Sequence, residues 1–208
     1  MGGLLVVLAV QRRPMDFEGV VLVAPFLGPD KQDGTWFKLA LVRVIGRVLP
    51  SLPLGSVGSY KACRDPAVIE RMDNDPLNYN GSLRAGYAAA MVQALKRAHA
   101  RADAVQIPLL ILHGSGDKNC DPDASRDFFE KVSSGDKTLK MYSGAYHCLL
   151  DEPDGVGQRV QGDIVNWCSE RLPAPPPPSA SSSREMPCGR SFDHPRSGEE
   201  LEAMASSA

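Results

Sequence analysis

The chain has 208 residues, 43% of them hydrophobic, and a formal net charge of −2 at pH 7. That length is typical of one domain with a single buried core. The charge is balanced and lysine and arginine are scattered, which argues against a nucleic-acid-binding protein. The five cysteines are odd in number and contain no C-x-x-C pair, so a reduced compartment is favoured over a disulfide framework.

An apolar segment, residues 1–10, opens the chain. It is shorter than the roughly 20 residues that span a bilayer. Its arginines follow the apolar stretch, whereas a signal peptide places basic residues before it. We predict a buried helix here. Because no capping residue precedes this helix, we also expect that further sequence belongs upstream.

Three short apolar runs predict the strands of a parallel sheet. Residues 20–24 are continuously apolar and end at Pro25, as in a strand buried on both faces. Residues 109–112 repeat this pattern. Residues 139–142 alternate more, which is typical of a strand nearer an edge.

Helical patterns alternate with these strands. Asp121-Pro122 is typical of a helix start, and this helix is predicted to continue through Phe128 to Val132. A second helix, over 157–172, is predicted to have one apolar face made of Val160, Ile164, Val165, Trp167 and Cys168. Strands that alternate with helices predict an α/β domain with parallel strands.

A long segment, about residues 26–107, separates the first two predicted strands. Within it, residues 36–49 and 83–104 have helical patterns, and Lys38, Arg43 and Arg47 form a narrow basic stripe. Connections in compact α/β folds are only about 2–6 residues long, so this segment is predicted to be a lid.

From residue 174 the chain becomes rich in proline and serine. Four consecutive prolines, residues 175–178, are followed by polar residues with few apolar ones. Such a composition cannot bury enough surface to order itself. We therefore predict a folded domain over 1–173 and a disordered tail over 174–208.

Asp117 and His147 are the candidates for catalysis. Each lies in a loop of small residues that follows a predicted parallel strand, at the edge of the sheet where catalytic groups gather. A carboxylate can orient an imidazole, which then acts as general base toward a hydroxyl or thiol. The same placement also suits a turn-forming aspartate and a loop histidine without any catalytic role.

The other histidines are weaker candidates. His99 is predicted to be solvated on a helix face, His113 to be structural, and His194 to lie in the tail. The ligands of a metal site could come from His113, Cys120, Asp121, His147 and Cys148. No spacing such as H-E-x-x-H or C-x-x-C supports that site, so we expect no metal and no other cofactor.

A cysteine nucleophile is the remaining alternative. Cys148 directly follows His147 in sequence, which is a poor arrangement for a nucleophile and its base. Cys120 lies near a helix start and is predicted to be at most part of a pocket wall.

Four segments together resemble a known family. They are FEGVVLVAP at 17–25, DPL at 75–77, LILHGSGDKNCD at 110–121 and DKTLKMYSGAYH at 136–147. In type, order and approximate spacing they are similar to the monoacylglycerol lipases, serine hydrolases with an S33-like domain. The resemblance covers residues 1 to about 172 and implies the C-terminal half of an α/β-hydrolase fold with a helical lid.

This resemblance implies roles for individual residues. Asp117 corresponds to the acid of the catalytic triad and His147 to the general base, in the order serine, acid, histidine. Cys120 matches a cysteine often found near that acid. The implied reaction cleaves monoacylglycerol to a fatty acid and glycerol.

The sequence departs from the family at the nucleophile. No serine has glycine two residues before it and two residues after it, as G-x-S-x-G requires. Met1-Gly2-Gly3 resembles the residues that follow the nucleophile, which places Met1 at the oxyanion position. We therefore expect this chain to be inactive by itself. We also expect it to be poorly stable, because the outer edge of the 20–24 strand would be uncovered.

The predicted lid suggests the kind of substrate. The lid residues that we expect to contact an acyl chain or a membrane interface are Trp36, Phe37, Leu41 and Ile45. The alternative is a helix buried against the core. We expect a cytoplasmic protein with a small lipid substrate and peripheral membrane contact. A non-catalytic lipid- or partner-binding fragment, and a related esterase or lysophospholipase, remain open as functions.

Overall fold

The computed structural model describes residues 1–28, 36–55, 62–79 and 81–172; for residues 36–39 it describes the backbone only. The predicted tail at 174–208 lies outside the described residues, as does His194. Residues Met1–Leu172 form one compact unit.

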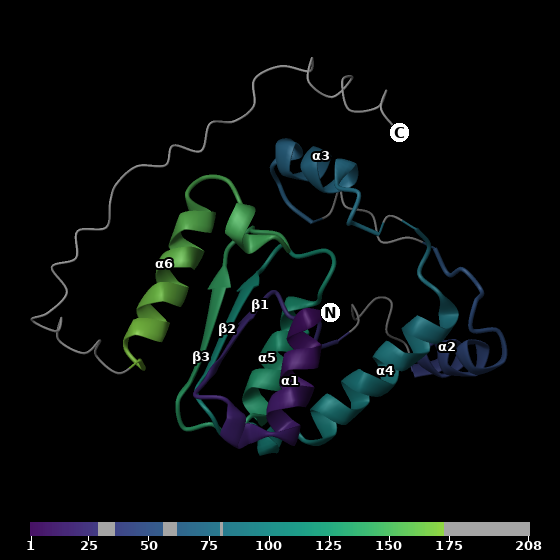
Figure 1. Cartoon of the computed structure of the whole chain (residues 1–208), viewed down its shortest axis with the longest axis horizontal. Coiled ribbons are helices and arrows are strands. Elements are labelled where there is room, and N and C mark those ends of the chain that lie inside the picture. The colour runs from purple at the N-terminus through teal and green to yellow at the C-terminus, as the bar shows by residue number, and fades with distance from the viewer. Residues whose placement is uncertain (29–35, 56–61, 80, 173–208) are drawn as a thin grey trace, which may run out of the picture. The chain divides into compact units, whose positions relative to one another are not determined.

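Within the described residues, a parallel sheet of three strands lies at the centre of this unit (Figure 1). The strands are β1 (Val20–Val23), β2 (Leu109–Gly114) and β3 (Lys137–Tyr142), in the order β1-β2-β3. The register pairs Leu22 with Ile111, and Ile111 with Leu139. The predicted α/β class, the parallel strands and the edge position of β3 are confirmed.

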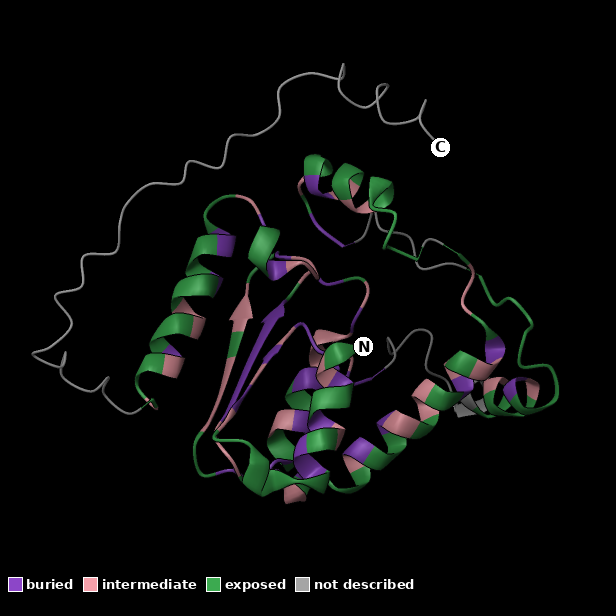
Figure 2. Ribbon diagram, in the orientation of Figure 1, coloured by how far each residue is buried: buried purple, intermediate pink, exposed green. Residues whose placement is uncertain are grey.

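The burial of the strands follows from their positions in the sheet. Every residue of β2 is buried, because strands and helices surround it (Figure 2). In β1, buried residues alternate with half-buried ones, so the prediction of full burial on both faces was wrong. The reason is that Val20 and Leu22 face the core on the α1 and α5 side, whereas Val21 and Val23 face the α6 side, where they are only partly covered.

Helices cover both faces of the sheet. Helices α1 (Gly2–Arg12) and α5 (Pro122–Lys131) lie on one face, and α6 (Val156–Ser169) lies on the other (Figure 1). Along β2, Leu109 and Ile111 belong to the core on the α1 and α5 side, whereas Leu110 and Leu112 belong to the core beneath α6. This alternation is the period-two pattern of a strand.

Helix α5 begins where the sequence predicts and with the expected cap. Asp121 accepts a 2.9 Å hydrogen bond from the Asp123 amide at the start of α5, and Pro122 occupies the first turn. In α6 the predicted apolar face is correct except for Val165, which is 61% exposed. Val160 and Trp167 face the sheet at helical spacing, which turns Val165 toward solvent.

In its described residues, the insertion between β1 and β2 contains three helices and a short helical turn. They are α2 (Trp36–Val48), α3 (Pro66–Asn74), α4 (Ala85–Ala100) and η3 (Ala102–Ala104). The predicted helices correspond to α2 and to α4 with η3, whereas α3 was not predicted. Two further helical turns are η1 (Pro14–Asp16) and η4 (Leu149–Asp151).

Close packing joins the insertion to the rest of the unit. A Cβ atom on Gly46 of α2 would lie 2.5 Å from the Ala85 carbonyl oxygen, so α2 and α4 approach too closely for a larger residue. Gln11 of α1 donates hydrogen bonds of 2.7 and 2.9 Å to the carbonyls of Ala98 and Arg101. The insertion is therefore anchored on the α1 face of the sheet.

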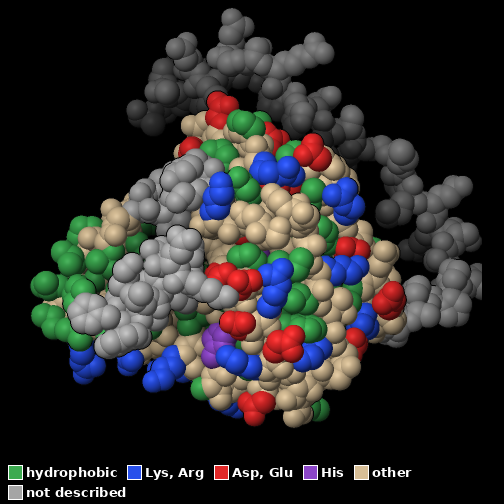
Figure 3. Space-filling model, turned by 180° about the vertical axis from the view of Figure 1, so that it is seen from behind, with side chains coloured by type: hydrophobic (Ala, Val, Ile, Leu, Met, Phe, Trp, Pro, Cys, Tyr) green, Lys and Arg blue, Asp and Glu red, His purple; other side chains and the backbone are tan. Residues whose placement is uncertain are grey.

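Apolar side chains are exposed on α2 and the segment that follows it. They are Leu41, Val44, Val48, Leu49, Leu52 and Leu54. Hydrophobic side chains gather on the left of Figure 3, with lysine and arginine side chains below them. In the part of the chain that the structure describes, no helix combines the length and apolar character needed to cross a membrane.

Candidate active site

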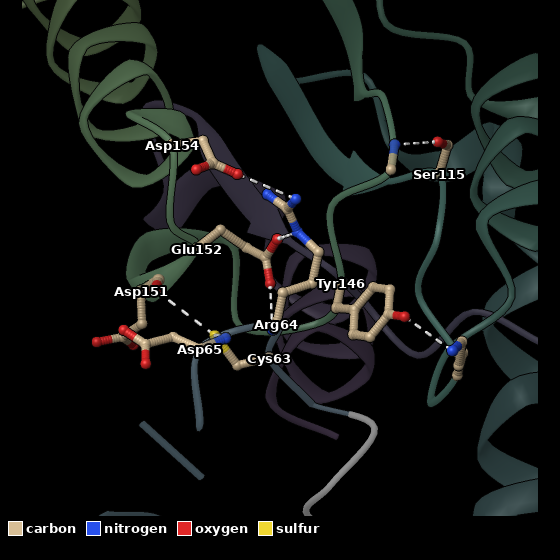
Figure 4. A network of polar contacts seen from close by, with 10 residues as sticks. Cys63, Arg64, Asp65, Ser115, Tyr146, Asp151, Glu152 and Asp154 are labelled. Atoms are coloured by element: carbon tan, nitrogen blue, oxygen red, sulfur yellow. Dashed lines mark hydrogen bonds and ion pairs between the residues drawn. The ribbon is translucent and has the colours of Figure 1, made fainter. Parts of the chain in front are cut away.

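The loops that follow β2 and β3 meet at the carboxyl end of the sheet. The Gly116 amide donates a 3.0 Å hydrogen bond to the Ala145 carbonyl, and the Ser115 amide donates a 2.9 Å bond to the Tyr142 carbonyl. The Ser115 hydroxyl accepts a 2.9 Å bond from the Gly144 amide (Figure 4). The parallel strands thus place Asp117 and His147 side by side, as expected from their positions after neighbouring strands.

Asp117 and His147 form a direct hydrogen bond. His147 Nδ1 lies 2.9 Å from Asp117 Oδ2, and the other carboxylate oxygen accepts bonds of 2.7 and 2.9 Å from the amides of Asn119 and Cys120. The Asp117 side chain is fully buried, whereas the His147 side chain is 29% exposed. A buried carboxylate thus orients an accessible imidazole, the arrangement needed for a general base.

His113 is a further partner of Asp117. The sequence predicts a structural role for His113 but does not predict this contact. Its Nε2 lies 3.1 Å from Asp117 Oδ2, and its Nδ1 lies 2.8 Å from the hydroxyl of Ser125 in α5. The consistent assignment has Nε2–H donating to Asp117 and Nδ1 accepting from Ser125. The available signal was a polar residue inside the buried run of β2, because buried polar groups require partners.

Asp117 and His147 each stabilise the charged form of the other. Burial opposes ionisation of Asp117, but hydrogen bonds from His113, His147 and the Cys120 amide outweigh it and hold its pKa far below the usual range. The hydrogen bond to Asp117, followed by that with Cys120, raises the pKa of His147 against the opposing effect of burial. Asp117 therefore stabilises the imidazolium form of His147, which is the form that a general base reaches once it has accepted a proton.

The free energy of unfolding is expected to fall as pH rises from 6.5 to about 10, because folding raises the pKa of His147 from 6.5 to about 10. A group with a raised pKa stabilises the folded state fully below its unfolded value and loses that contribution as pH rises through the folded value. His147→Ala should remove this part of the pH dependence. Urea unfolding of both chains across this range measures it, and equal slopes would contradict the interaction.

A pocket of about 900 Å³ lies beside this pair. Its described lining is mostly apolar, from Phe26 and Leu27 after β1, from α2 and α4, and from Met1, Cys120 and His147. His99 also lines it, with its Nε2 2.5 Å from the Leu27 carbonyl oxygen and its ring edge against Phe128. The prediction that His99 is solvated was therefore wrong, because α4 turns this side chain toward the pocket.

The lid residues predicted to contact the substrate are not among the described residues that line this pocket. From α2, Ala40 and Val42 are among the described lining residues, whereas Leu41 is exposed and Ile45 is half-buried away from the lining. Trp36 and Phe37 belong to α2, but their side chains lie outside the described part. Met1 lines the pocket, and its sulfur accepts a 2.7 Å hydrogen bond from the Tyr87 hydroxyl.

The geometry is less favourable for a metal site or a cysteine nucleophile. One potential ligand atom each from Asp117, Cys120 and His147 lie within 4.8 Å of one another. However, four hydrogen bonds already occupy the Asp117 carboxylate. Asp121 caps α5 and does not join this group. Burial raises the pKa of the Cys148 thiol to about 11, which disfavours the thiolate that a cysteine nucleophile requires.

Comparison with known proteins identifies the family. Residues 1–154 match the hydrolase family described as serine aminopeptidase, S33. This chain belongs to that family. The S33 hydrolase chain is 33% identical to human monoglyceride lipase over 171 residues, which cover 82% of this chain and 56% of the relative. It is 32% identical to the monoacylglycerol lipase of Mycolicibacterium smegmatis over 83% of this chain and 60% of the relative.

Solved structures support the same family. The crystal structure of Paleococcus ferrophilus monoacylglycerol lipase matches the S33 hydrolase chain with a TM-score of 0.74 at 30% identity. The match covers 82% of this chain and 65% of that structure. The parallel sheet with helices on both faces is thus a partial α/β-hydrolase fold, and the chain spans between half and two thirds of the length of these relatives.

Proposed function

We propose that the chain supplies the acid, the base and the acyl pocket of a carboxylic-ester hydrolase that cleaves monoacylglycerol to a fatty acid and glycerol. The observation that carries this proposal is the 2.9 Å hydrogen bond between Asp117 and His147 beside an apolar pocket. The family and the names of the relatives support it. No cofactor takes part in this reaction.

In the proposed reaction, His147 acts in its neutral form, with Nδ1–H donating to Asp117, and its Nε2 accepts the proton of a serine hydroxyl as the serine oxygen attacks the ester carbonyl. The imidazolium, held by Asp117, then gives this proton to the departing glycerol oxygen, which leaves an acyl-serine. His147 then takes a proton from a water molecule, and the water oxygen attacks the carbonyl of the acyl-serine. The proton passes to the serine oxygen as the bond to the acyl group breaks, which releases the fatty acid. Met1 occupies the position whose amide would stabilise the oxyanion.

The proposal includes that these 208 residues are inactive by themselves. They contain no G-x-S-x-G motif, so we propose that the nucleophilic serine comes from a segment outside these residues. No strand in the part of the chain that the structure describes pairs with the outer edge of β1, and we propose this edge as the place for further strands, without which we expect low stability.

The pocket supports an acyl substrate. A volume of about 900 Å³ lies within the range of small-molecule sites, and its apolar lining matches a hydrocarbon chain. We propose that the insertion acts as a lid. Its exposed apolar residues Leu41, Val44 and Val48, next to Arg43 and Arg47, would make peripheral contact with a lipid surface.

The test is hydrolysis of a monoacylglycerol by two purified proteins. The 208-residue chain is expected to show background rates only. The same chain joined, ahead of Met1, to a segment that supplies further strands and a G-x-S-x-G motif is expected to release fatty acid, and His147→Ala in that protein should abolish release. Turnover by the 208-residue chain that depends on His147 would show that another residue is the nucleophile.

Two other functions are separated by the same proteins. A related esterase or lysophospholipase would prefer other esters over monoacylglycerol in a substrate panel. A non-catalytic lipid-binding protein would bind a non-hydrolysable acylglycerol analogue without turnover in either protein.

A further inference from the structure

The segment after His147 is held by the insertion and not by the sheet alone. The amide of Cys148, the next residue along the chain, donates a 2.7 Å hydrogen bond to the Ala62 carbonyl. Cys63 contributes a second link, since its thiol donates to the Asp151 carbonyl at 3.5 Å. Residues 62–64 of the insertion therefore run beside residues 148–154.

Arg64 and Glu152 form the centre of this contact (Figure 4). Glu152 Oε1 accepts a 3.0 Å hydrogen bond from the Arg64 amide, and Oε2 accepts a 2.6 Å bond from Arg64 Nε. The Glu152 side chain is fully buried, whereas that of Arg64 is 32% exposed. A buried carboxylate is unfavourable without such a partner, so removing Arg64 would disturb this loop strongly.

Arg64 also reaches the start of α6. Its Nη1 lies 3.2 Å from Asp154 Oδ2, and Asp154 has a left-handed φ of 60° just before Gly155. One side chain thus connects the insertion to two points of the loop that leads from His147 into α6. Its guanidinium suits this role because its donors diverge in a fixed planar geometry.

The part of the loop before His147 has separate supports. The Ser115 hydroxyl bonds to the Gly144 amide, and Lys118 Nζ donates a 2.8 Å bond to the Tyr146 hydroxyl. The loop after β2, which carries Asp117, therefore supports the residues just before His147, and the insertion supports the residues just after it. Between these two anchors, the imidazole is aligned with Asp117.

We propose that Arg64 and Glu152 are positioning residues, and that their ion pair uses the insertion to align His147 with Asp117. This inference rests on the proposed role of His147 as general base. It gives the insertion a second role. Besides lining the acyl pocket, the insertion keeps the imidazole of His147 within hydrogen-bonding distance of the Asp117 carboxylate. Misalignment of about 1 Å between such groups can lower a rate about 100-fold.

The test is made on the 208-residue chain and needs no hydrolysis. Carbon-13-labelled histidine reports the titration of His147 by NMR, and amide hydrogen exchange reports the opening of the Cys148 bond. In Arg64→Ala we expect the pKa of His147 to fall by about one unit or more toward 6.5, because the Asp117 bond is weakened. Exchange at Cys148 should become about tenfold faster, while β2 amides stay protected.

Arg71→Ala is the matched control. Arg71 lies on α3 and pairs with Asp151 of the same loop at 2.8 Å, but both side chains are exposed. This variant should leave the His147 titration and the Cys148 exchange unchanged. Arg64→Lys should restore part of the effect of Arg64→Ala, because it keeps the charge beside Glu152 but loses the planar fork.

Each outcome decides the proposal. If Arg64→Ala does not fold, Arg64→Lys and Glu152→Gln replace it, with smaller shifts of the same sign expected. Folded variants whose His147 titrates as in the parent chain would overturn the proposal. Unfolding of all three variants would also overturn it, since the pair would then serve general stability. If the proposed hydrolysis fails while these shifts appear, only the catalytic role of His147 is lost.

Discussion

Asp117→Asn is expected to lower kcat about 10⁴-fold in the protein that joins this chain to a G-x-S-x-G segment, with little change in KM. The carboxylate accepts the Nδ1–H of His147 and favours the imidazolium that forms during the reaction. An asparagine amide can hold the imidazole in the wrong tautomer and cannot stabilise its positive charge. Steady-state hydrolysis of monoacylglycerol measures this loss.

Asp16→Asn is the control for this experiment. Asp16 forms an exposed ion pair with Arg13 in η1, so its replacement should leave kcat unchanged. A loss of less than about tenfold in Asp117→Asn would mean that Asp117 is not the acid. The proposed reaction would then have to be revised, whatever the stability of the variant.

Gly114→Ala should separate the two loops of the site. Gly114 ends β2, and a Cβ atom there would lie 2.2 Å from the Ala145 carbonyl oxygen and 2.6 Å from that of Tyr146. Both contacts are with backbone, so the loop after β3, which carries His147, would have to move. We expect a loss of about 1–3 kcal/mol in the free energy of unfolding from overpacking. We also expect about a 100-fold lower kcat from displacement of His147.

Gly162→Ala is the matched glycine control. Gly162 lies within α6, and a Cβ atom there would meet nothing within 4 Å. This change should raise the free energy of unfolding by about 1 kcal/mol, because alanine favours a helix interior over glycine. Urea unfolding of both variants tests the opposite signs. A Gly114→Ala chain as stable and active as its parent would contradict the close approach of the loops.

The elements that the sequence determined are those governed by short-range patterns. The apolar run of β2, the Asp121-Pro122 start of α5 and the period of α6 each depend on neighbouring residues. The meeting of Asp117 and His147 was also predictable, because loops that follow adjacent parallel strands lie at the same edge. The family resemblance then suggested roles for these two residues, and the family itself is confirmed.

Only the tertiary structure decided which distant residues support that pair. Arg64 and Glu152 are 88 positions apart, and neither lies in a motif that points to the other. The sequence predicts a structural role for His113 but not its partners, Asp117 and Ser125, which β2 and α5 bring to it. The pocket faces Ala40 and Val42, not Leu41 or Ile45, because the packing of α2 on α4 sets its rotation. Periodicity identifies an apolar face, but which neighbour that face meets depends on contacts between elements far apart in the chain.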